Sequence, residues 1–278
     1  MTPMTTDTVT PDRSAIGLVA TMFRRGPAQR TLHLTWFAFF LTFVAWFNFA
    51  PFAKTIGNQF ELSKAQIVTL GLCNLALTVP ARIIVGGVLD RLGPRRTYSA
   101  ILAFAAIPCF LFATAQSFEQ LVASRLLMGV VGAGFVVGIR MVSEWFPPSE
   151  LGTAEGIYGG WGNFGAAAAA LTLPTIATMA SGSEGWRWAV ALTGVLCLAY
   201  AAVYLRAVTD TPDGRTYKAV KRASALEVTS RSAVFGLITM SVPLAGALVV
   251  IAWRILHVGV IWKPDDHSPD QPALVSGQ

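Results

Sequence analysis

Seven apolar stretches, each long enough to cross a bilayer as a helix, alternate with shorter polar gaps along this 278-residue chain. A spanning helix needs about 20 predominantly apolar residues, because the hydrocarbon core of a bilayer is about 30 Å thick. The pattern predicts helices over residues 33–53, 66–89, 97–115, 119–143, 153–180, 187–206 and 233–256. The chain is therefore predicted to be an all-α, polytopic membrane protein.

The gaps between these stretches predict the organisation of the chain. A polar N-terminal segment, 1–32, precedes a six-helix unit, 33–206, which is followed by a basic loop, 207–232. A seventh transmembrane helix, 233–256, comes next, and the polar tail, 257–278, has a composition typical of disorder. Six helices with a weak three-plus-three symmetry before a long basic loop are the layout of one half of a secondary transporter.

Composition agrees with the membrane interpretation. Hydrophobic residues make up 54% of the chain and charged residues only 13%, whereas soluble domains carry about 25% charged residues. The net charge of +6 does not indicate a nucleic-acid partner, because the basic residues lie in short gaps between apolar stretches. They gather before the first helix, after the second and after the sixth, which predicts a cytoplasmic N-terminus in the inner or plasma membrane.

One charged residue, Arg82, interrupts the second apolar stretch. It lies eight residues before Asp90, which is roughly 12 Å of helix and places it inside the hydrocarbon layer. A charge at that depth costs at least about 2.5–3.5 kcal/mol and is expected to have a partner or a function. No acidic residue lies near Arg82 in the sequence, so two interpretations stay open: an anion-binding residue and a structural ion-pair partner.

The turn after the second helix has a distinctive spacing of glycines and charges, Gly86-Gly87-Val88-Leu89-Asp90-Arg91-Leu92-Gly93-Pro94-Arg95-Arg96. It resembles the loop motif of the major facilitator superfamily, in which this cluster is a cytoplasmic latch between helices. The resemblance implies latch roles for Gly86, Asp90, Arg91, Gly93, Arg95 and Arg96. The alternative is a basic cytoplasmic turn with no further role.

The fourth helix carries a second motif, which begins at Arg125 and continues with Gly129, Gly132 and Gly134. Its spacing resembles another superfamily motif, and the glycines are expected to let a neighbouring helix approach closely. Arg125 either belongs to that motif or extends to the outer interface as a snorkelling side chain. For Arg140, near the cytoplasmic end, snorkelling is the preferred interpretation.

The fifth helix is unusually rich in glycine, with Gly156, Gly160, Gly162 and Gly165 available for helix packing. The segment from Gly156 to Ala170 resembles the signature of the nitrate/nitrite porter family, a branch of the same superfamily. The resemblance extends over about 33–256 and includes 210–214 and 226–230 in the basic loop. A generic glycine-rich packing helix is the alternative.

Members of that family bind their anion between an arginine on helix two and another on helix eight. The resemblance implies substrate-binding roles for Arg82, Asn163, Phe135 and Phe49, with Phe47 and Phe52 as alternatives to Phe49. Nitrate is flat and singly charged, and a guanidinium fork matches such an oxyanion in a plane. Helices two and five occupy equivalent places in a three-plus-three repeat, so Arg82 and Asn163 are expected to meet near the midplane.

The family has twelve helices, whereas this sequence predicts seven and lacks the helix-eight arginine. The interpretations left open are a truncated or partial porter, a half that pairs with a missing C-terminal half or a second chain, and a non-transporting membrane subunit. The expected function is nitrate uptake or nitrate/nitrite exchange in nitrate assimilation, by symport or antiport, with transport of another small solute as the alternative. The expected partners are nitrate or nitrite and the lipid bilayer.

Enzyme chemistry is not indicated. The cysteines Cys73, Cys109 and Cys197 each lie inside an apolar stretch, which predicts that they are small core residues. The sequence shows no nucleophile–base set, no nucleotide-binding loop and no Cys/His spacing typical of a metal site. We therefore expect neither catalysis nor a cofactor.

Overall fold

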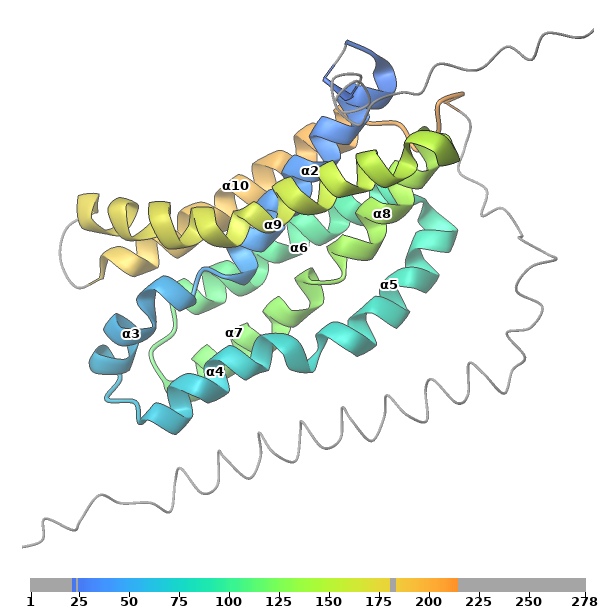
Figure 1. The fold of residues 1–278 in the computed structure, drawn as a ribbon. Helices are drawn as coiled ribbons and strands as arrows, with labels where there is room; N and C mark the ends of the chain where they lie inside the picture. Colours follow the sequence, from blue (N-terminus) through green and yellow to red (C-terminus); the bar gives the residue numbers. More distant parts are fainter. Residues whose placement is uncertain (1–21, 24, 181–183, 215–278) are drawn as a thin grey trace, which may run out of the picture.

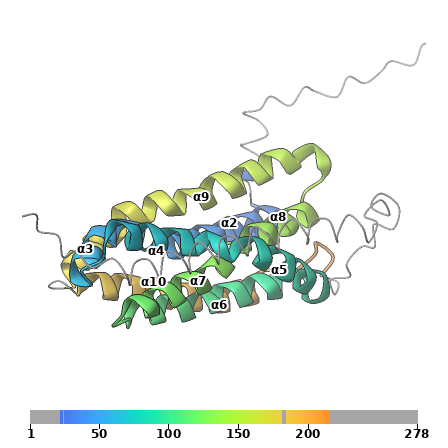
Figure 2. The same cartoon turned by 90° about the horizontal axis from the view of Figure 1, so that it is seen from below.

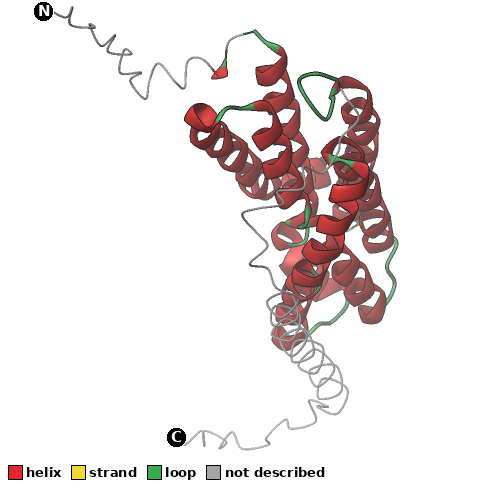
Figure 3. Ribbon diagram, turned by 90° about the vertical axis from the view of Figure 1, so that its right-hand side faces the viewer, coloured by secondary structure: helices red, strands yellow, loops and turns green. Residues whose placement is uncertain are grey.

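The computed structural model describes residues 22–214, apart from residue 24 and residues 181–183, and regular structure in that part is helical throughout (Figure 3). Its elements are α2 (Pro27–Trp46), η1 (Ala50–Phe52), α3 (Ala53–Gln59), α4 (Lys64–Ala76), α5 (Thr78–Leu92), α6 (Pro94–Ala113), α7 (Phe118–Val131), α8 (Gly134–Trp145), α9 (Pro148–Met179) and α10 (Gly185–Ala207). The predicted seventh helix, 233–256, lies outside the described residues.

All six helices predicted between 33 and 206 are present. Five helical stretches of the described part are long and apolar enough to cross a membrane: Pro27–Gln59, Lys64–Leu92, Pro94–Ala113, Phe118–Trp145 and Gly185–Ala207. The sixth predicted span corresponds to α9, which has 32 residues but is not among the five. The prediction of an all-α polytopic membrane protein is confirmed.

Three of the predicted spans are interrupted, where the sequence predicts one continuous helix each. The first ends as α2 at Trp46 and continues through η1 into α3. The second breaks at Leu77, between α4 and α5. The fourth breaks at residues 132–133, between α7 and α8. Each break leaves backbone groups that a continuous helix would have paired, and these need other partners.

The helices repeat their contacts in two sets of three. In one set, α2 packs on α9 and on α10. In the other set, α7 packs on α4 and on α6 in the same way. Helices α6 and α10 also pack against each other. Figure 1 shows α7 and α8 between α9 and the α4–α5 pair, and in Figure 2 α9 and α6 form opposite edges of the bundle. This arrangement agrees with the three-plus-three symmetry that the sequence predicts.

The surface of the bundle is apolar over several helices. Ile84 on α5, Leu171 on α9 and Trp188 on α10 are each about two-thirds exposed, and large side chains of this kind are suited to contact with lipid. The interior is filled by close-packed aromatic and aliphatic side chains, of which the largest fully buried ones are Trp186, Tyr98, Tyr158, Tyr204, Phe39 and Phe112. The described part is therefore built as a multi-pass membrane bundle.

Candidate functional site

Arg82 lies on the second turn of α5 and is exposed at the surface of the bundle. The buried stripe of α5 consists of Thr78, Ala81, Val85 and Leu89, so the side chain of Arg82 starts from a different face of the helix. Within the described residues, Arg82 takes part in no ion pair. The interpretation of Arg82 as a structural ion-pair partner thus gains no support from this part of the chain.

Asn163 is exposed on α9, and its side-chain amide donates to the backbone carbonyl of Gly159 at 2.8 Å. One of the two side-chain N–H groups of Asn163 donates within its own helix. The second N–H and the amide oxygen therefore remain available for a hydrogen bond to another group. No hydrogen bond joins Asn163 to Arg82 in the described part of the chain. The expected meeting of these two side chains near the midplane is therefore not seen there.

Phe135 stands on the first turn of α8 inside a cluster of aromatic rings. Its ring centroid is 5.4 Å from that of Phe39 and 6.2 Å from that of Tyr158. The Tyr158 hydroxyl lies 3.2 Å from the carbonyl oxygen of Phe135 and 3.4 Å from the Tyr98 hydroxyl. Phe39 was not predicted as a site residue, because nothing in its sequence surroundings distinguishes it from the other phenylalanines of the first span.

Phe49 lies away from this cluster. It is buried after the end of α2, where its ring centroid is 5.3 Å from the guanidinium carbon of Arg125 and 6.1 Å from the ring of Phe112. The structure therefore groups Phe49 with Arg125, and it groups Phe135 with Phe39. The role implied for Phe49 beside the anion stays a prediction that these contacts do not support.

Arg125 is buried, with only 3% of its surface exposed. Its guanidinium donates to the side-chain oxygen of Asn48 and to the carbonyl of Trp46, both at 3.1 Å, and lies over the rings of Phe49 and Phe112. The interpretation of Arg125 as a snorkelling side chain is therefore wrong: neighbouring helices enclose it. A buried cation is stabilised by such hydrogen bonds and aromatic faces when no carboxylate pairs with it.

Arg140, which was expected to snorkel, is half-buried on α8 and forms an ion pair with Glu144 at 2.9 Å. The two residues are one helical turn apart, so the pair lies along the helix surface. Pairs of this kind contribute about 0.3–0.5 kcal/mol. The pair with Glu144 therefore links the Arg140 side chain to the next turn of its own helix.

The latch turn between α5 and α6 is fixed on one side by the segment after α10. Gly93 adopts a positive φ of 81°, which favours glycine, and this lets the chain reverse before α6. The backbone N–H of Arg95 donates to the carboxylate of Asp210 at 2.8 Å, and its guanidinium donates to the carbonyl of Leu205 at 2.7 Å. Asp210 therefore caps the first turn of α6.

The other latch residues make fewer contacts. Asp90, Arg91 and Arg96 are exposed, and Asp90 forms no ion pair within the described residues. A Cβ added at Gly86 would meet no atom within 4 Å in that part of the chain. Gly86 therefore makes no close contact between described helices, and its latch role stays a prediction.

The packing glycines divide into a contacting set and an open set. A Cβ at Gly129 would lie 2.7 Å from the carbonyl oxygen of Asn74, and one at Gly134 would lie 3.0 Å from the ring of Tyr98. The contacting set is Gly129, Gly132, Gly134, Gly162 and Gly165, whereas a Cβ at Gly156 or Gly160 would meet nothing within 4 Å. These two glycines form the floor of an open groove lined by Thr153, Gly156, Ile157, Gly160, Trp161 and Phe164.

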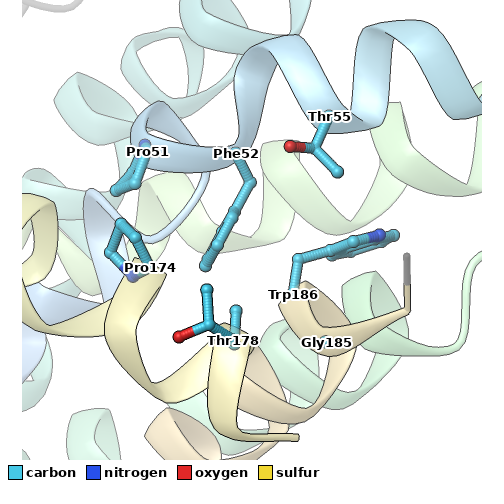
Figure 4. Close-up of a pocket in the computed structure, with 8 residues that line it drawn as sticks. Pro51, Phe52, Thr55, Pro174, Thr178, Gly185 and Trp186 are labelled. Atoms are coloured by element: carbon cyan, nitrogen blue, oxygen red, sulfur yellow. The ribbon is translucent and has the colours of Figure 1, made fainter. Parts of the chain in front are cut away.

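A separate cavity of about 230 Å³ lies at the opposite end of α9 (Figure 4). It is lined by Pro51, Phe52, Thr55, Pro174, Ala177, Thr178, Gly185 and Trp186. None of these side chains is charged, and Phe52, an alternative to Phe49 in the predicted site, is the one residue among them that the sequence analysis named. The cavity therefore offers no counter-charge for an anion.

Comparison with known proteins identifies the family. The family model described as Major Facilitator Superfamily matches residues 35–262. The chain is 55% identical over 238 residues to the nitrate/nitrite transporter NrtP of Nostoc punctiforme, covering 84% of this chain and 48% of the relative. It is 52% identical to NrtP of Picosynechococcus, with the same coverage, and 35% identical over 178 residues to the probable nitrate/nitrite antiporter NarK1 of Thermus thermophilus, covering 60% and 39%.

The solved structures agree in fold. A bacterial homologue of the human lysosomal transporter Spinster, inward-facing and occupied, superposes with a TM-score of 0.55 at 18% identity, over 72% of this chain and 47% of that one. The chain spans about half the length of the curated relatives NrtP that it matches. The resemblance to nitrate/nitrite porters is confirmed at the level of sequence, and the chain belongs to the Major Facilitator Superfamily.

Proposed function

We propose that this chain serves in the transport of nitrate or nitrite across the membrane, with Arg82 as the residue that binds the anion. The observation that carries the proposal is an exposed guanidinium on a membrane helix with no ion pair in the described part. Such a charge is expensive in hydrocarbon, and a bound anion offsets that cost. The similarity to NrtP at 55% and 52% identity supports nitrate and nitrite as the substrates.

The chemistry of Arg82 suits a flat oxyanion. A guanidinium presents parallel N–H donors that match two oxygens of one anion, and an ammonium does not reproduce this geometry. Asn163 retains an N–H beyond the one that donates to Gly159, so its amide is proposed as a second, oriented donor. Phe135 is proposed as an aromatic neighbour of the anion.

Transport by rocking needs two helical units that enclose the anion in turn. We propose that the described bundle is one of these units and that the second is supplied by further helices of the same polypeptide or by another chain. The distribution of lysine and arginine supports a cytoplasmic N-terminus in the inner or plasma membrane. Symport and antiport are both compatible with this arrangement.

The test compares Arg82→Lys with wild type and with Arg206→Lys. Arg206 is exposed, and among the described residues its side chain donates to Ala202 of its own helix. Binding of nitrate to the purified chain in nanodiscs and nitrate uptake in a strain without its own porters are both measured. Loss of the bidentate contact is expected to weaken binding about 10- to 100-fold, from about 1.5–3 kcal/mol per charged hydrogen bond, whereas Arg206→Lys leaves binding unchanged. Equal binding by Arg82→Lys and wild type would reject the site. Competition by nitrite, but not by sulfate, is expected.

A further inference from the structure

Two of the interrupted spans break where they touch each other. Thr78 is the first residue of α5, directly after the break at Leu77. Its hydroxyl lies 2.8 Å from the carbonyl oxygen of Asn74, one turn back on α4, and 3.1 Å from the carbonyl oxygen of Gly129, near the end of α7. The break in the second span and the break in the fourth span therefore share one side chain.

The Thr78 hydroxyl has one proton and two acceptors. Both neighbouring atoms are carbonyl oxygens, and a hydroxyl donates to one of them at a time. Donation to Asn74 keeps the bond within the second span, and donation to Gly129 joins the second span to the fourth. Thr78 is only 6% exposed, so the choice lies between these two partners, and water does not replace either one readily.

Glycines bring the two spans together at this point. A Cβ at Gly129 would lie 2.7 Å from the carbonyl oxygen of Asn74, and a Cβ at Gly132 would lie 3.2 Å from the methyl group of Thr78. Real Cβ atoms hardly ever approach as closely as the first of these distances. The backbones of α4 and α7 are therefore in direct contact beside their breaks. A movement of the backbone at one break is therefore expected to displace the backbone at the other.

The third break is tied to the same two helices. The carbonyl of Trp46, the last residue of α2, accepts from the side-chain amide of Asn74 at 2.6 Å and from Arg125 at 3.1 Å. Arg125 also donates to Asn48, which lies inside the break after α2. Asn74 belongs to α4 and Arg125 to α7, so the end of α2 is held by both.

We propose that the three breaks form one hinge, at which α4 and α7 tilt together relative to α5 and α8, with Thr78 as the residue that positions the two spans. Arg82 lies one turn after Thr78 on α5, and Phe135 lies on the first turn of α8. Both predicted site residues thus stand directly beyond the breaks. The link from hinge to anion rests on the proposed function, whereas the hinge itself does not.

Hydrogen–deuterium exchange of the full chain in nanodiscs tests the hinge. Thr78→Val removes the hydroxyl and nearly preserves the shape, and Thr78→Ser restores the hydroxyl. Thr172→Val is the matched control, because within the described residues the Thr172 hydroxyl donates along its own helix, to Ala168 at 2.7 Å. We expect Thr78→Val to raise exchange several-fold in peptides covering both 74–80 and 128–136, and we expect Thr78→Ser and Thr172→Val to leave both unchanged. A rise confined to 74–80, or no rise at all, would overturn the shared hinge.

Nitrate binding to the same variants separates the two proposals. If the hinge positions the site, Thr78→Val weakens nitrate binding about three- to tenfold and Thr78→Ser restores it, whereas Arg82→Lys weakens binding without changing exchange at 74–80 or 128–136. Wild-type binding by Thr78→Val would overturn the positioning role. If the wild-type chain binds no nitrate, the proposed function fails, while the exchange result still decides whether the hinge exists.

Discussion

The aromatic ring of Phe39 on α2 fills the space beside Gly162 on α9, so that a Cβ added at position 162 would overlap the ring. One turn along α9, Gly165 meets the backbone carbonyl of Phe40 in the same way. Glycine is therefore required at these positions because α2 and α9 approach to contact distance. Phe39 also stacks on Tyr158, with centroids 5.0 Å apart, so the glycine contact positions the aromatic cluster that includes Phe135.

We predict that Gly162→Ala destabilises the bundle and that Gly160→Ala does not. The first substitution adds a methyl group to a filled contact, and overpacking of this kind costs about 1–3 kcal/mol. The second adds the same methyl group where nothing lies within 4 Å, and alanine is the better helix former. Thermal unfolding in detergent measures the difference. A Gly162→Ala protein as stable as Gly160→Ala would contradict the close approach of α2 and α9.

Arg125→Gln is expected to destabilise the protein more than Arg140→Gln. Loss of Arg125 removes a donor from the Asn48 oxygen, at about 1–3 kcal/mol for a buried acceptor left unpaired. It also removes one of the two donors to the Trp46 carbonyl, which keeps its bond from Asn74. Arg140 is half-buried, and its pair with the partly exposed Glu144 contributes about 0.3–0.5 kcal/mol. Chemical unfolding of both variants provides the comparison, and equal losses would argue against the buried network.

The presence and the order of the six spans could be predicted from the sequence, because the number of consecutive apolar residues sets whether a helix spans the bilayer. The breaks were not predicted, although prolines mark two of them. Pro51 follows the first break, and Pro80 stands in the first turn of α5, where it has no N–H to bond the carbonyl four residues back. The unpaired groups beside these breaks are satisfied by contacts between helices, such as Thr78 with Gly129, and a local pattern does not contain them.

For the candidate site too, the sequence does not predict which of the two arginines inside apolar stretches is buried. Arg82 and Arg125 look alike in the sequence, each a single charge among apolar neighbours. The structure buries Arg125 and exposes Arg82, because the face of each helix that meets its neighbours differs. The role implied for Phe49 stays a prediction, and its position after α2 places it beside Arg125, a contact that the sequence does not indicate.

Asp210→Ala is expected to loosen the latch turn, and Asp213→Ala to leave it unchanged. The Asp210 carboxylate accepts from the first turn of α6, and loss of such a cap costs about 0.5–2 kcal/mol. Asp213 is exposed, three residues farther along the same segment. Limited proteolysis of the 205–214 segment, together with thermal unfolding, reports both effects. Asp210→Asn retains an oxygen acceptor and should lie between wild type and Asp210→Ala; if it is as labile as Asp210→Ala, charge matters more than the hydrogen bond.

The orientation of the chain in the membrane is testable because the native cysteines are hidden. Cys73, Cys109 and Cys197 are each at most 2% exposed, so a membrane-impermeant maleimide should leave the wild-type protein unlabelled. The exposed positions Gln116, between α6 and α7, and Asp213, after α10, lie on opposite sides if every helix spans. With a cytoplasmic N-terminus, Gln116→Cys is labelled in intact cells and Asp213→Cys only after the cells are opened. The reverse pattern would invert the orientation inferred from the basic residues, and labelling of both positions in intact cells would show that the helices between them do not all cross the membrane.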